Sequence, residues 1–289
     1  MTVGFRTLGP GRAVLLLALG GMATIAACGT EAAAPEPSGT VYLVPVTGVV
    51  ELGLAPFIER SLKEAAAAGA SAVVLELETP GGRVDAAQRI VNAIEDAEIP
   101  VYAFVNRRAF SAGAMIALAT DGVYMRPGGV MGAATPVSGE GQKAPEKIVS
   151  AMRSEMRARA ERRDLDPRVA EAMVDENIEI EGVVEAGRLL TLTTQEAAAL
   201  NYAIPVEDWD DLLAQIGTED ARTVTTDENW AEHLVRFFTH PVVAPFLLSI
   251  GFLGLIVEIK TAGFGLAGAA GLLSLGLFFG AHMIVGLAG

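Results

Sequence analysis

The chain has 289 residues, of which 51% are apolar and 19% are charged, so it can bury a sizeable core and is not a disordered chain. Its mean hydropathy of +0.41 is high for a wholly soluble protein and predicts that some apolar residues lie in lipid. The net charge is −14, and residues 29–229 hold 33 acidic and 17 basic side chains, a net charge of −16. Nucleic-acid-binding proteins are normally basic, so this charge argues against that class.

Cysteine and histidine are scarce, and their scarcity limits the chemistry. Cys28 is the one cysteine of the chain, so neither an intrachain disulfide nor a cysteine-based zinc site can form, and we expect no metal and no cofactor. The three histidines all lie at position 233 or later. A Ser-His-Asp triad within residues 29–229 is therefore excluded.

Residues 1–28 are typical of an export signal. They contain two Arg and no acid, and residues 13–27 carry no charge but are too few for a comfortable membrane span. The stretch ends in the sequence IAAC, which resembles a bacterial lipoprotein box and predicts that Cys28 is lipidated. The alternatives are an ordinary signal peptide, cut near residues 32–34, and an uncleaved anchor.

The polar body that follows alternates strands and helices. Apolar and β-branched runs predict strands, and apolar residues at helical spacing predict helices. In chain order we expect a strand over 41–46, a helix over 55–68, a strand over 72–77, a helix over 84–97, a strand over 100–105, a helix over 112–119, a strand over 123–125 and helices over 146–163, 194–200 and 208–216. This order predicts an α/β layer fold.

Two segments interrupt the pattern and supply candidate site residues. Thr79-Pro80-Gly81-Gly82 directly follows a predicted strand, where adjacent glycines let the backbone approach a ligand and point amides at it. The alternative is a simple strand-to-helix turn. Ser111 opens a helix of very small residues. It is either a helix cap or a nucleophile at a helix N-terminus, where the amides and the dipole favour a developing oxyanion.

Lys147 is the third candidate. The sequence APEK, which ends at Lys147, predicts a helix start with Pro145 at the first helical position. A lysine in the first turn lies at the positive end of the helix dipole, which costs a few tenths to about 1 kcal/mol and favours the neutral amine that a general base needs. Because the body contains no histidine, a serine nucleophile there needs a carboxylate or a lysine as its base, and Ser-Lys dyads are a known form of this chemistry.

The C-terminal end contains two long apolar stretches. Residues 241–257 and 261–289 carry no formal charge with histidine counted as neutral, and both are long enough for membrane helices, the first marginally. A glycine-rich turn that begins at Lys260 joins them, so we expect a transmembrane hairpin. Lys260 favours a cytoplasmic turn, which agrees with an exported body. The alternative is a buried hairpin in a soluble protein.

Several short motifs occur in order along the chain. They are Leu77-Glu78-Thr79-Pro80-Gly81-Gly82, Ser111-Ala112-Gly113, Met125-Arg126-Pro127-Gly128, Gly132-Ala133-Ala134-Thr135-Pro136, Trp230-Ala231-Glu232 and the segment 241–265. Together they resemble the NfeD family of membrane-bound serine proteases. These are ClpP-class proteins, also called stomatin operon partner proteins, and are related to the signal peptide peptidase SppA. The resemblance covers about residues 40–289.

The resemblance implies an α/β, ClpP/crotonase-like fold of stacked ββα units with a Ser-Lys dyad. Carried over by motif, Ser111 matches the nucleophile and Lys147 the base. The oxyanion hole matches the amide of Ala112 and that of one glycine of the pair, Gly81 or Gly82. The family also implies an apolar peptide substrate, a stomatin- or flotillin-like partner, a membrane setting and a homodimer or larger oligomer.

Two features depart from the family pattern. Arg107 and Arg108 stand where small residues usually precede the serine, and we expect them to narrow the apolar substrate path. Long forms of the family carry further membrane helices and a C-terminal OB-like β-barrel, and we expect these parts to be absent, encoded separately or lost by truncation.

The sequence thus predicts five parts. They are a signal peptide over 1–28, a flexible tether over 29–39, a ClpP/crotonase-like serine protease domain over 40–218, a juxtamembrane connector over 219–240 and a transmembrane helix pair over 241–289.

Three functions fit these observations. The first is a serine endopeptidase of the cell membrane with an exported protease domain, in which Lys147 takes the proton of Ser111. The second is a non-catalytic membrane scaffold for a stomatin- or flotillin-like protein, and the presence of both residues favours the enzyme over it. The third is a crotonase-like acyl-CoA enzyme, which shares an oxyanion hole, but an exported compartment without CoA argues against it.

Overall fold

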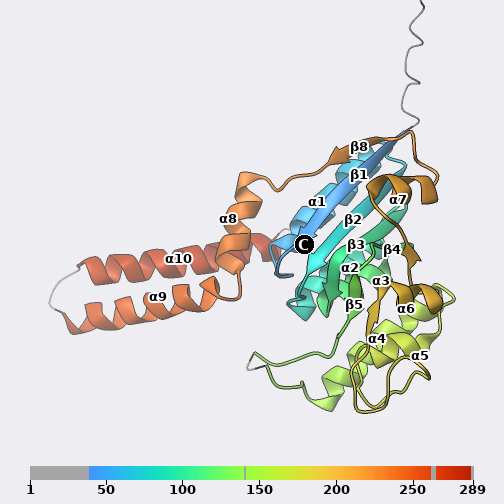
Figure 1. Ribbon diagram of the computed structural model, residues 1–289. Helices are drawn as coiled ribbons and strands as arrows, with labels where there is room; N and C mark the ends of the chain where they lie inside the picture. The colour runs from blue at the N-terminus through green and yellow to red at the C-terminus, as the bar shows by residue number, and fades with distance from the viewer. Residues whose placement is uncertain (1–38, 140, 262–264, 288–289) are drawn as a thin grey trace, which may run out of the picture. The chain divides into compact units, whose positions relative to one another are not determined.

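The structure of the chain is a computed structural model that describes residues 39–139, 141–261 and 265–287 (Figure 1). These residues form an α/β domain that begins at strand β1 and, after it, a pair of long apolar helices. The predicted export signal with Cys28, and all of the predicted tether except Gly39, lie outside the described residues.

A mainly parallel sheet lies at the centre of the α/β domain, with the strand order β6-β5-β3-β2-β1-β8 and with β4 paired between β3 and β7 (Figure 1). The strands are β1 Thr40–Thr47, β2 Ala72–Thr79, β3 Val101–Phe110, β4 Gly122–Met125, β5 Val130–Gly132, β6 Thr191–Thr193, β7 Ile204–Pro205 and β8 Arg222–Thr225. Of their pairings, β5–β6 alone is antiparallel. Parallel neighbours need crossover connections, and helices supply them from β1 to β4.

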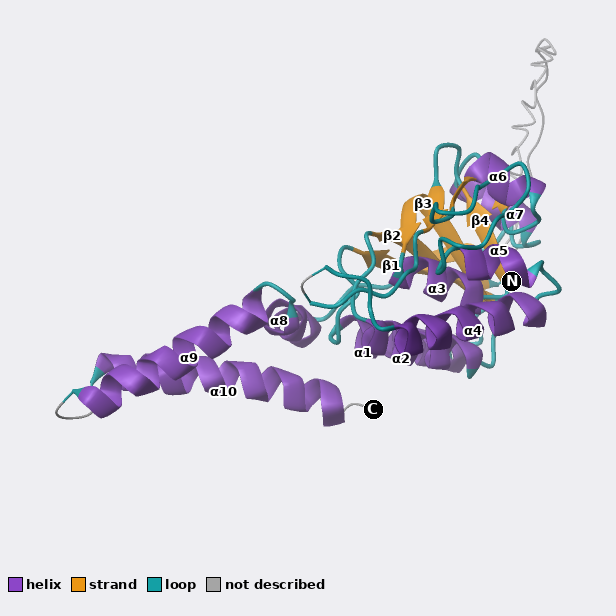
Figure 2. Ribbon diagram, turned by 90° about the horizontal axis from the view of Figure 1, so that it is seen from below, coloured by secondary structure: helices purple, strands orange, loops and turns teal. Residues whose placement is uncertain are grey.

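Helices cover both faces of the sheet. They are α1 Leu54–Ala67, α2 Val84–Glu95, α3 Ala112–Ala119, α4 Glu146–Arg162, α5 Pro167–Ala172, α6 Thr194–Ala199, α7 Trp209–Gln215, α8 Trp230–Thr239, α9 Val243–Lys260 and α10 Leu266–Leu287. Figure 2 shows α1, α2 and α4 together on one side of the strands. Val73 and Leu75 of β2 pack into the core on one face, and Val74 packs with Leu212 of α7 on the other. A strand buried on both faces is apolar throughout, which explains the unbroken apolar run of β2.

The predicted α/β layer fold is confirmed. Every predicted strand and helix of the body is present, with its ends shifted by at most two residues, apart from β3. The sequence predicts that this strand ends at Val105, but it continues to Phe110 because its second half pairs with β5 after its first half has paired with β4. The short elements α5 and β5 to β8 were not predicted, since pairing and packing position them and their own residues show no long apolar period.

Strand β8 lies in the segment 219–240, which the sequence assigns to a juxtamembrane connector. Its four residues pair in parallel with residues 40–43 of β1, so the sheet continues past residue 218. The strand is largely exposed at the sheet edge, and its sequence, RTVT, contains one apolar residue. A strand with one apolar residue shows no apolar alternation, so the sequence pattern does not predict it.

Helix α8, in the same segment, is tied to the domain by charged groups. Arg60 of α1 donates from Nε and Nη2 to the two carboxylate oxygens of Glu232, at 2.7 and 2.9 Å. Glu51 is only 1% exposed and accepts hydrogen bonds from Arg236 Nε at 2.8 Å and from Thr239 Oγ1 at 2.7 Å. A buried carboxylate needs such partners, so α8 is part of the folded domain.

The helices α9 and α10 form the predicted hairpin. They approach closely where small residues face each other: a Cβ on Gly254 would lie 2.8 Å from the Cα of Gly271. Both helices are long and apolar enough to cross a membrane, and only 6% and 28% of their most apolar windows are buried. This exposure contradicts the alternative of a buried hairpin in a soluble protein.

Candidate active site

The loop after β2 contains the two candidate glycines. Gly81 has a φ of +98°, a conformation that favours glycine. Its N–H donates to Thr79 Oγ1 at 3.0 Å, and its carbonyl accepts from the N–H of Val50 at 2.9 Å. Gly82 packs directly against Val50, because a Cβ at position 82 would lie 2.0 Å from the Val50 carbonyl oxygen. Both positions therefore require glycine, and the loop is held against the residues that follow β1.

Ser111 lies at the junction of β3 and α3 in an unusual backbone conformation, with φ 53° and ψ −114°. Its N–H donates to the carbonyl of Gly132 at 2.9 Å, which fixes the turn against β5. Its side chain makes no capping bond to α3, and its hydroxyl has no partner in the described part of the chain. Ser111 therefore occupies the N-cap position of α3 without the side-chain hydrogen bond of a helix cap. A positive φ at a residue other than glycine costs about 1–3 kcal/mol, and such conformations cluster at functional sites.

The glycine loop and the serine meet at the carboxyl ends of β2 and β3. These strands are parallel neighbours, so their ends lie at the same edge of the sheet. A Cβ on Gly81 would lie 2.6 Å from the Cβ of Ser111 and 3.2 Å from its Oγ. The sequence-predicted serine and glycine pair are thus in direct contact.

Two backbone amides beside Ser111 are without acceptors among the described residues. The first is that of Ala112, in the first turn of α3, where helix amides have no intrahelical partner. The second is that of Gly82, whose neighbours Gly81 and Arg83 make the bridge to Val50. The N–H of Gly81 donates to Thr79. Of the two predicted glycines, Gly82 is therefore the one whose N–H is available to donate to a substrate oxyanion.

A small apolar cavity adjoins Ser111. Its volume is about 10 Å³, close to that of one water molecule. It is lined by Val84, Ala87, Ser111, Ala112, Met115, Ala134, Pro136 and Met152. The lining suits an apolar side chain, but a space of about one water molecule admits none, so a substrate side chain enters only if residues that line the cavity move.

Lys147 makes no hydrogen bond to Ser111 in this structure. Helix α4 begins at Glu146, with Pro145 as its N-cap rather than its first helical residue, and Lys147 lies in the first turn as predicted. Its side chain is exposed and makes no hydrogen bond or ion pair within the described residues. The next lysine, Lys143, donates to Glu176 Oε1 at 2.7 Å, and this bond raises the pKa of Lys143. Of these two lysines, Lys147 is therefore the one whose amine makes no hydrogen bond or ion pair within the described residues.

Arg107 and Arg108 lie away from the cavity. Both side chains are exposed at the end of β3, and the Nη1 of Arg107 is 3.4 Å from Glu78 Oε1. Neither residue lines the cavity at Ser111, and their expected narrowing of the substrate path stays a prediction.

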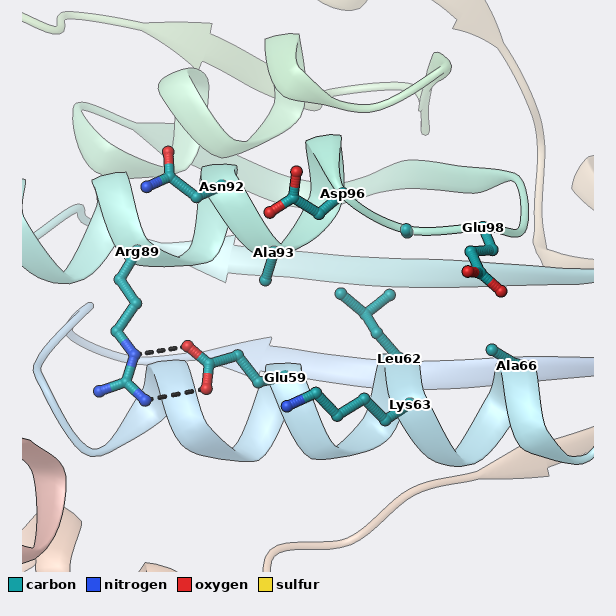
Figure 3. Close-up of a pocket in the computed structure, with 10 residues that line it drawn as sticks. Glu59, Leu62, Lys63, Ala66, Arg89, Asn92, Ala93, Asp96 and Glu98 are labelled. Carbon is teal, nitrogen blue, oxygen red and sulfur yellow. Dashed lines mark hydrogen bonds and ion pairs between the residues drawn. The ribbon is translucent and has the colours of Figure 1, made fainter. Parts of the chain in front are cut away.

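A groove of about 630 Å³ lies elsewhere, between α1 and α2 (Figure 3). Arg89 and Glu59 point toward each other across it, with Arg89 Nη2 donating to Glu59 Oε2 at 2.8 Å. Its lining contains no serine, cysteine or histidine. No cluster of metal-binding side chains occurs among the described residues either. The chemistry is therefore expected at the smaller cavity.

Sequence reasoning missed Val50 and Glu51, which support the glycine loop. Val50 bonds to the carbonyl of Gly81 and the N–H of Arg83, and the adjacent Glu51 is buried. The signal was present, because an acid within the apolar run VVEL that follows a strand is a candidate for a buried, partnered charge.

Gly81→Ala is expected to disrupt the site. The alanine methyl would collide with Ser111 and also face the cost of the positive φ, so we expect the free energy of unfolding to fall by about 1–3 kcal/mol beyond that cost of about 1–2 kcal/mol. Gly128→Ala is the matched control, because Gly128 has a similar φ of +82° and a Cβ there would meet nothing within 4 Å. Thermal unfolding of the two variants measures the difference. Equal losses would show that the contact with Ser111 is not tight.

Comparison with known proteins identifies the family of this chain. The profile of the NfeD1b N-terminal domain matches residues 40–226, and that of the NfeD integral membrane domain matches residues 242–289. The membrane protein NfeD1b of Bacillus subtilis (strain 168) is 43% identical over 274 residues, 94% of this chain and 63% of that protein. The membrane-bound protease PH1510 of Pyrococcus horikoshii is 27% identical over 239 residues, 77% of this chain and 54% of that protein. The chain thus spans less than two thirds of the length of either relative.

A solved structure shares the fold. The 1510-N membrane-bound stomatin-specific protease of P. horikoshii, as a lysine-to-alanine variant in complex with a substrate peptide, matches with a TM-score of 0.61 and 24% identity, over 70% of this chain and 98% of that chain. The mixed α/β domain thus shares its fold with this protease domain. With both profiles in chain order and the helical hairpin in the second, the chain belongs to the NfeD family and is a membrane protein with an NfeD1b N-terminal domain.

Proposed function

We propose that this protein is a membrane-bound serine endopeptidase with Ser111 as its nucleophile. The observation that carries the proposal is the unpartnered hydroxyl of Ser111, held at a positive φ beside two backbone amides without acceptors among the described residues. A serine at the start of a helix, next to free amides, is suited to attack a carbonyl and to stabilise the oxyanion that forms.

The proposed reaction begins with a dyad of Ser111 and Lys147. The neutral amine of Lys147 takes the proton of Ser111 as Oγ bonds to the peptide carbonyl carbon. The N–H groups of Gly82 and Ala112 donate to the resulting oxyanion. Lys147 then returns the proton to the leaving amine as the peptide bond breaks, and water hydrolyses the acyl-enzyme by the same route.

This mechanism requires a rearrangement at the start of α4. Lys147 is exposed, and the cavity at Ser111 is too small for a side chain. Lys147 and Met152 are five residues apart on the same helix, and Met152 lines the cavity. A shift of the N-terminal part of α4 that moves both residues would admit the substrate, and we propose that it also brings the amine to the serine.

The substrate is proposed to be an apolar segment of a stomatin- or flotillin-like membrane protein. The apolar lining of the cavity supports an apolar side chain at the cleaved bond. The fold relative is a stomatin-specific protease, and its lysine-to-alanine variant holds a substrate peptide. We further propose a homodimer or larger oligomer and an exported orientation of the α/β domain, which the predicted export signal and Lys260 support.

The alternative is a scaffold that binds such a partner without cleaving it. The two are separated by incubating the full-length protein in detergent micelles with a panel of apolar peptides and analysing the products by mass spectrometry. Cleavage that is lost in Ser111→Ala supports the peptidase. Intact peptides with a folded protein that still binds them would favour the scaffold.

Lipidation of Cys28 is a separate prediction. We expect labelled palmitate to enter the protein in expressing bacterial cells and Cys28→Ser to remove the label, because the sequence IAAC is typical of a lipoprotein box. N-terminal sequencing provides the control. A mature protein that begins at residues 33–36 would instead indicate an ordinary signal peptide.

A further inference from the structure

Helix α8 presents an apolar stripe that nothing in the described chain covers. Trp230, Leu234 and Phe237 are 77%, 46% and 58% exposed, even with α9 and α10 present. At 100° per residue the three side chains fall within about 60° of the helix circumference. They therefore form one continuous stripe, at the i, i+4 and i+7 spacing of an amphipathic helix.

The opposite face of α8 contacts the α/β domain. Glu232 is bound by Arg60, and Thr239 donates to the buried Glu51. These two residues lie about 180° around the helix from the stripe. Asn229 caps the helix and forms a capping box with Glu232, so the helix is well defined at its N-terminus. The stripe consequently has a fixed direction, pointing away from the domain.

The chain places α8 at the membrane surface. Three residues, 240–242, separate its last residue from the first residue of the apolar helix α9. Four residue steps span at most about 14 Å, so the end of α8 lies within that distance of the start of the span. The bilayer headgroup region begins where the apolar span ends, and tryptophan is enriched in this region because its ring is apolar with one polar edge.

We propose that α8 is an interfacial helix whose stripe of Trp230, Leu234 and Phe237 inserts into the lipid at the boundary between headgroups and acyl chains. The stripe carries no charge, and the residues 29–229 have a net charge of −16, so attraction to anionic lipid does not hold it there. Apolar contact does, as for other helices that lie in the plane of a membrane. The helix fixes the α/β domain on the bilayer through Glu232 and Thr239.

The two tryptophans of the chain allow a direct test. Trp209→Phe leaves Trp230 as the single tryptophan, and Trp230→Phe leaves Trp209, which donates to Thr223 Oγ1 and packs on Phe104 in the domain. The full-length variants are reconstituted into phosphatidylcholine vesicles whose acyl chains carry bromine near the headgroup or near the bilayer centre. Bromine quenches tryptophan emission on contact, so quenching reports which residue touches lipid and at what depth.

Trp230 is expected to lose most of its emission with bromine near the headgroup and less with bromine at the centre, while Trp209 keeps nearly all of its emission. Comparing wild type with Trp230→Phe gives the same result if Trp209→Phe misfolds. Equal quenching of the two residues would overturn the proposal. So would a Trp230 shielded from aqueous iodide but not quenched by lipid, which indicates a second copy of the chain on the stripe, or quenching that requires anionic lipid.

Discussion

Ser111→Ala is expected to abolish peptide cleavage and covalent labelling by a fluorophosphonate probe. Removing the catalytic serine of a serine protease lowers kcat by about 10⁶, which is the loss we expect here. The fold should survive, because the hydroxyl makes no hydrogen bond within the described residues and alanine matches the rest of the side chain. Labelling of the full-length protein, followed by mass spectrometry of its peptides, identifies the reactive residue.

Ser154→Ala is the control for this experiment. Ser154 lies on α4 with its side chain exposed, so its loss should leave labelling and cleavage unchanged. If the probe labels another serine, or labels none in a folded preparation that cleaves peptides, Ser111 is not the nucleophile.

Lys147→Ala is expected to lower kcat by about 10²–10⁴, the usual contribution of a positioned general base. Lys147→Arg should be almost as inactive, because arginine stays protonated and cannot accept the serine proton. Initial rates of cleavage of the best peptide of the panel provide the comparison.

Lys143→Ala is the matched control for the lysine. Lys143 is four residues earlier and is engaged by Glu176, which raises its pKa and keeps it charged. Its loss should change kcat little. Full activity in Lys147→Arg together with a large loss in Lys143→Ala would show that the assigned base is wrong.

The sequence predicted those parts of the site where the backbone conformation or close packing allows only one type of residue. Gly81 needs its positive φ, and Gly82 needs the absence of a Cβ against Val50, so glycine marks both. Ser111 was located because it directly precedes a helix that begins with small residues, and the contact of position 113 with Thr79 explains why that residue is glycine. The strand ends then bring the two segments together, as parallel neighbours must.

Other parts of the fold and of the site form through contacts with residues far away in the sequence, so the local sequence does not predict them. Strand β8 forms because the edge of β1 is available, and its own polar sequence does not predict it. Whether Lys147 reaches Ser111 depends on the position of the first turn of α4, which is set by tertiary packing. The order of the motifs gave the dyad of Ser111 and Lys147 as a hypothesis. In the structure the two side chains make no hydrogen bond to each other.

The ties between α8 and the domain have a practical consequence for truncation. A soluble form cut at residue 218, where the sequence alone suggests a boundary, would lack β8 and α8. The edge of β1 would be left unpaired and open to other chains. Glu51 and Arg60 would lose the partners that α8 supplies, and Val235 would no longer cover the apolar surface beneath it. The shortest form that keeps the domain whole and lacks the apolar helix pair therefore ends after Thr239, just before helix α9.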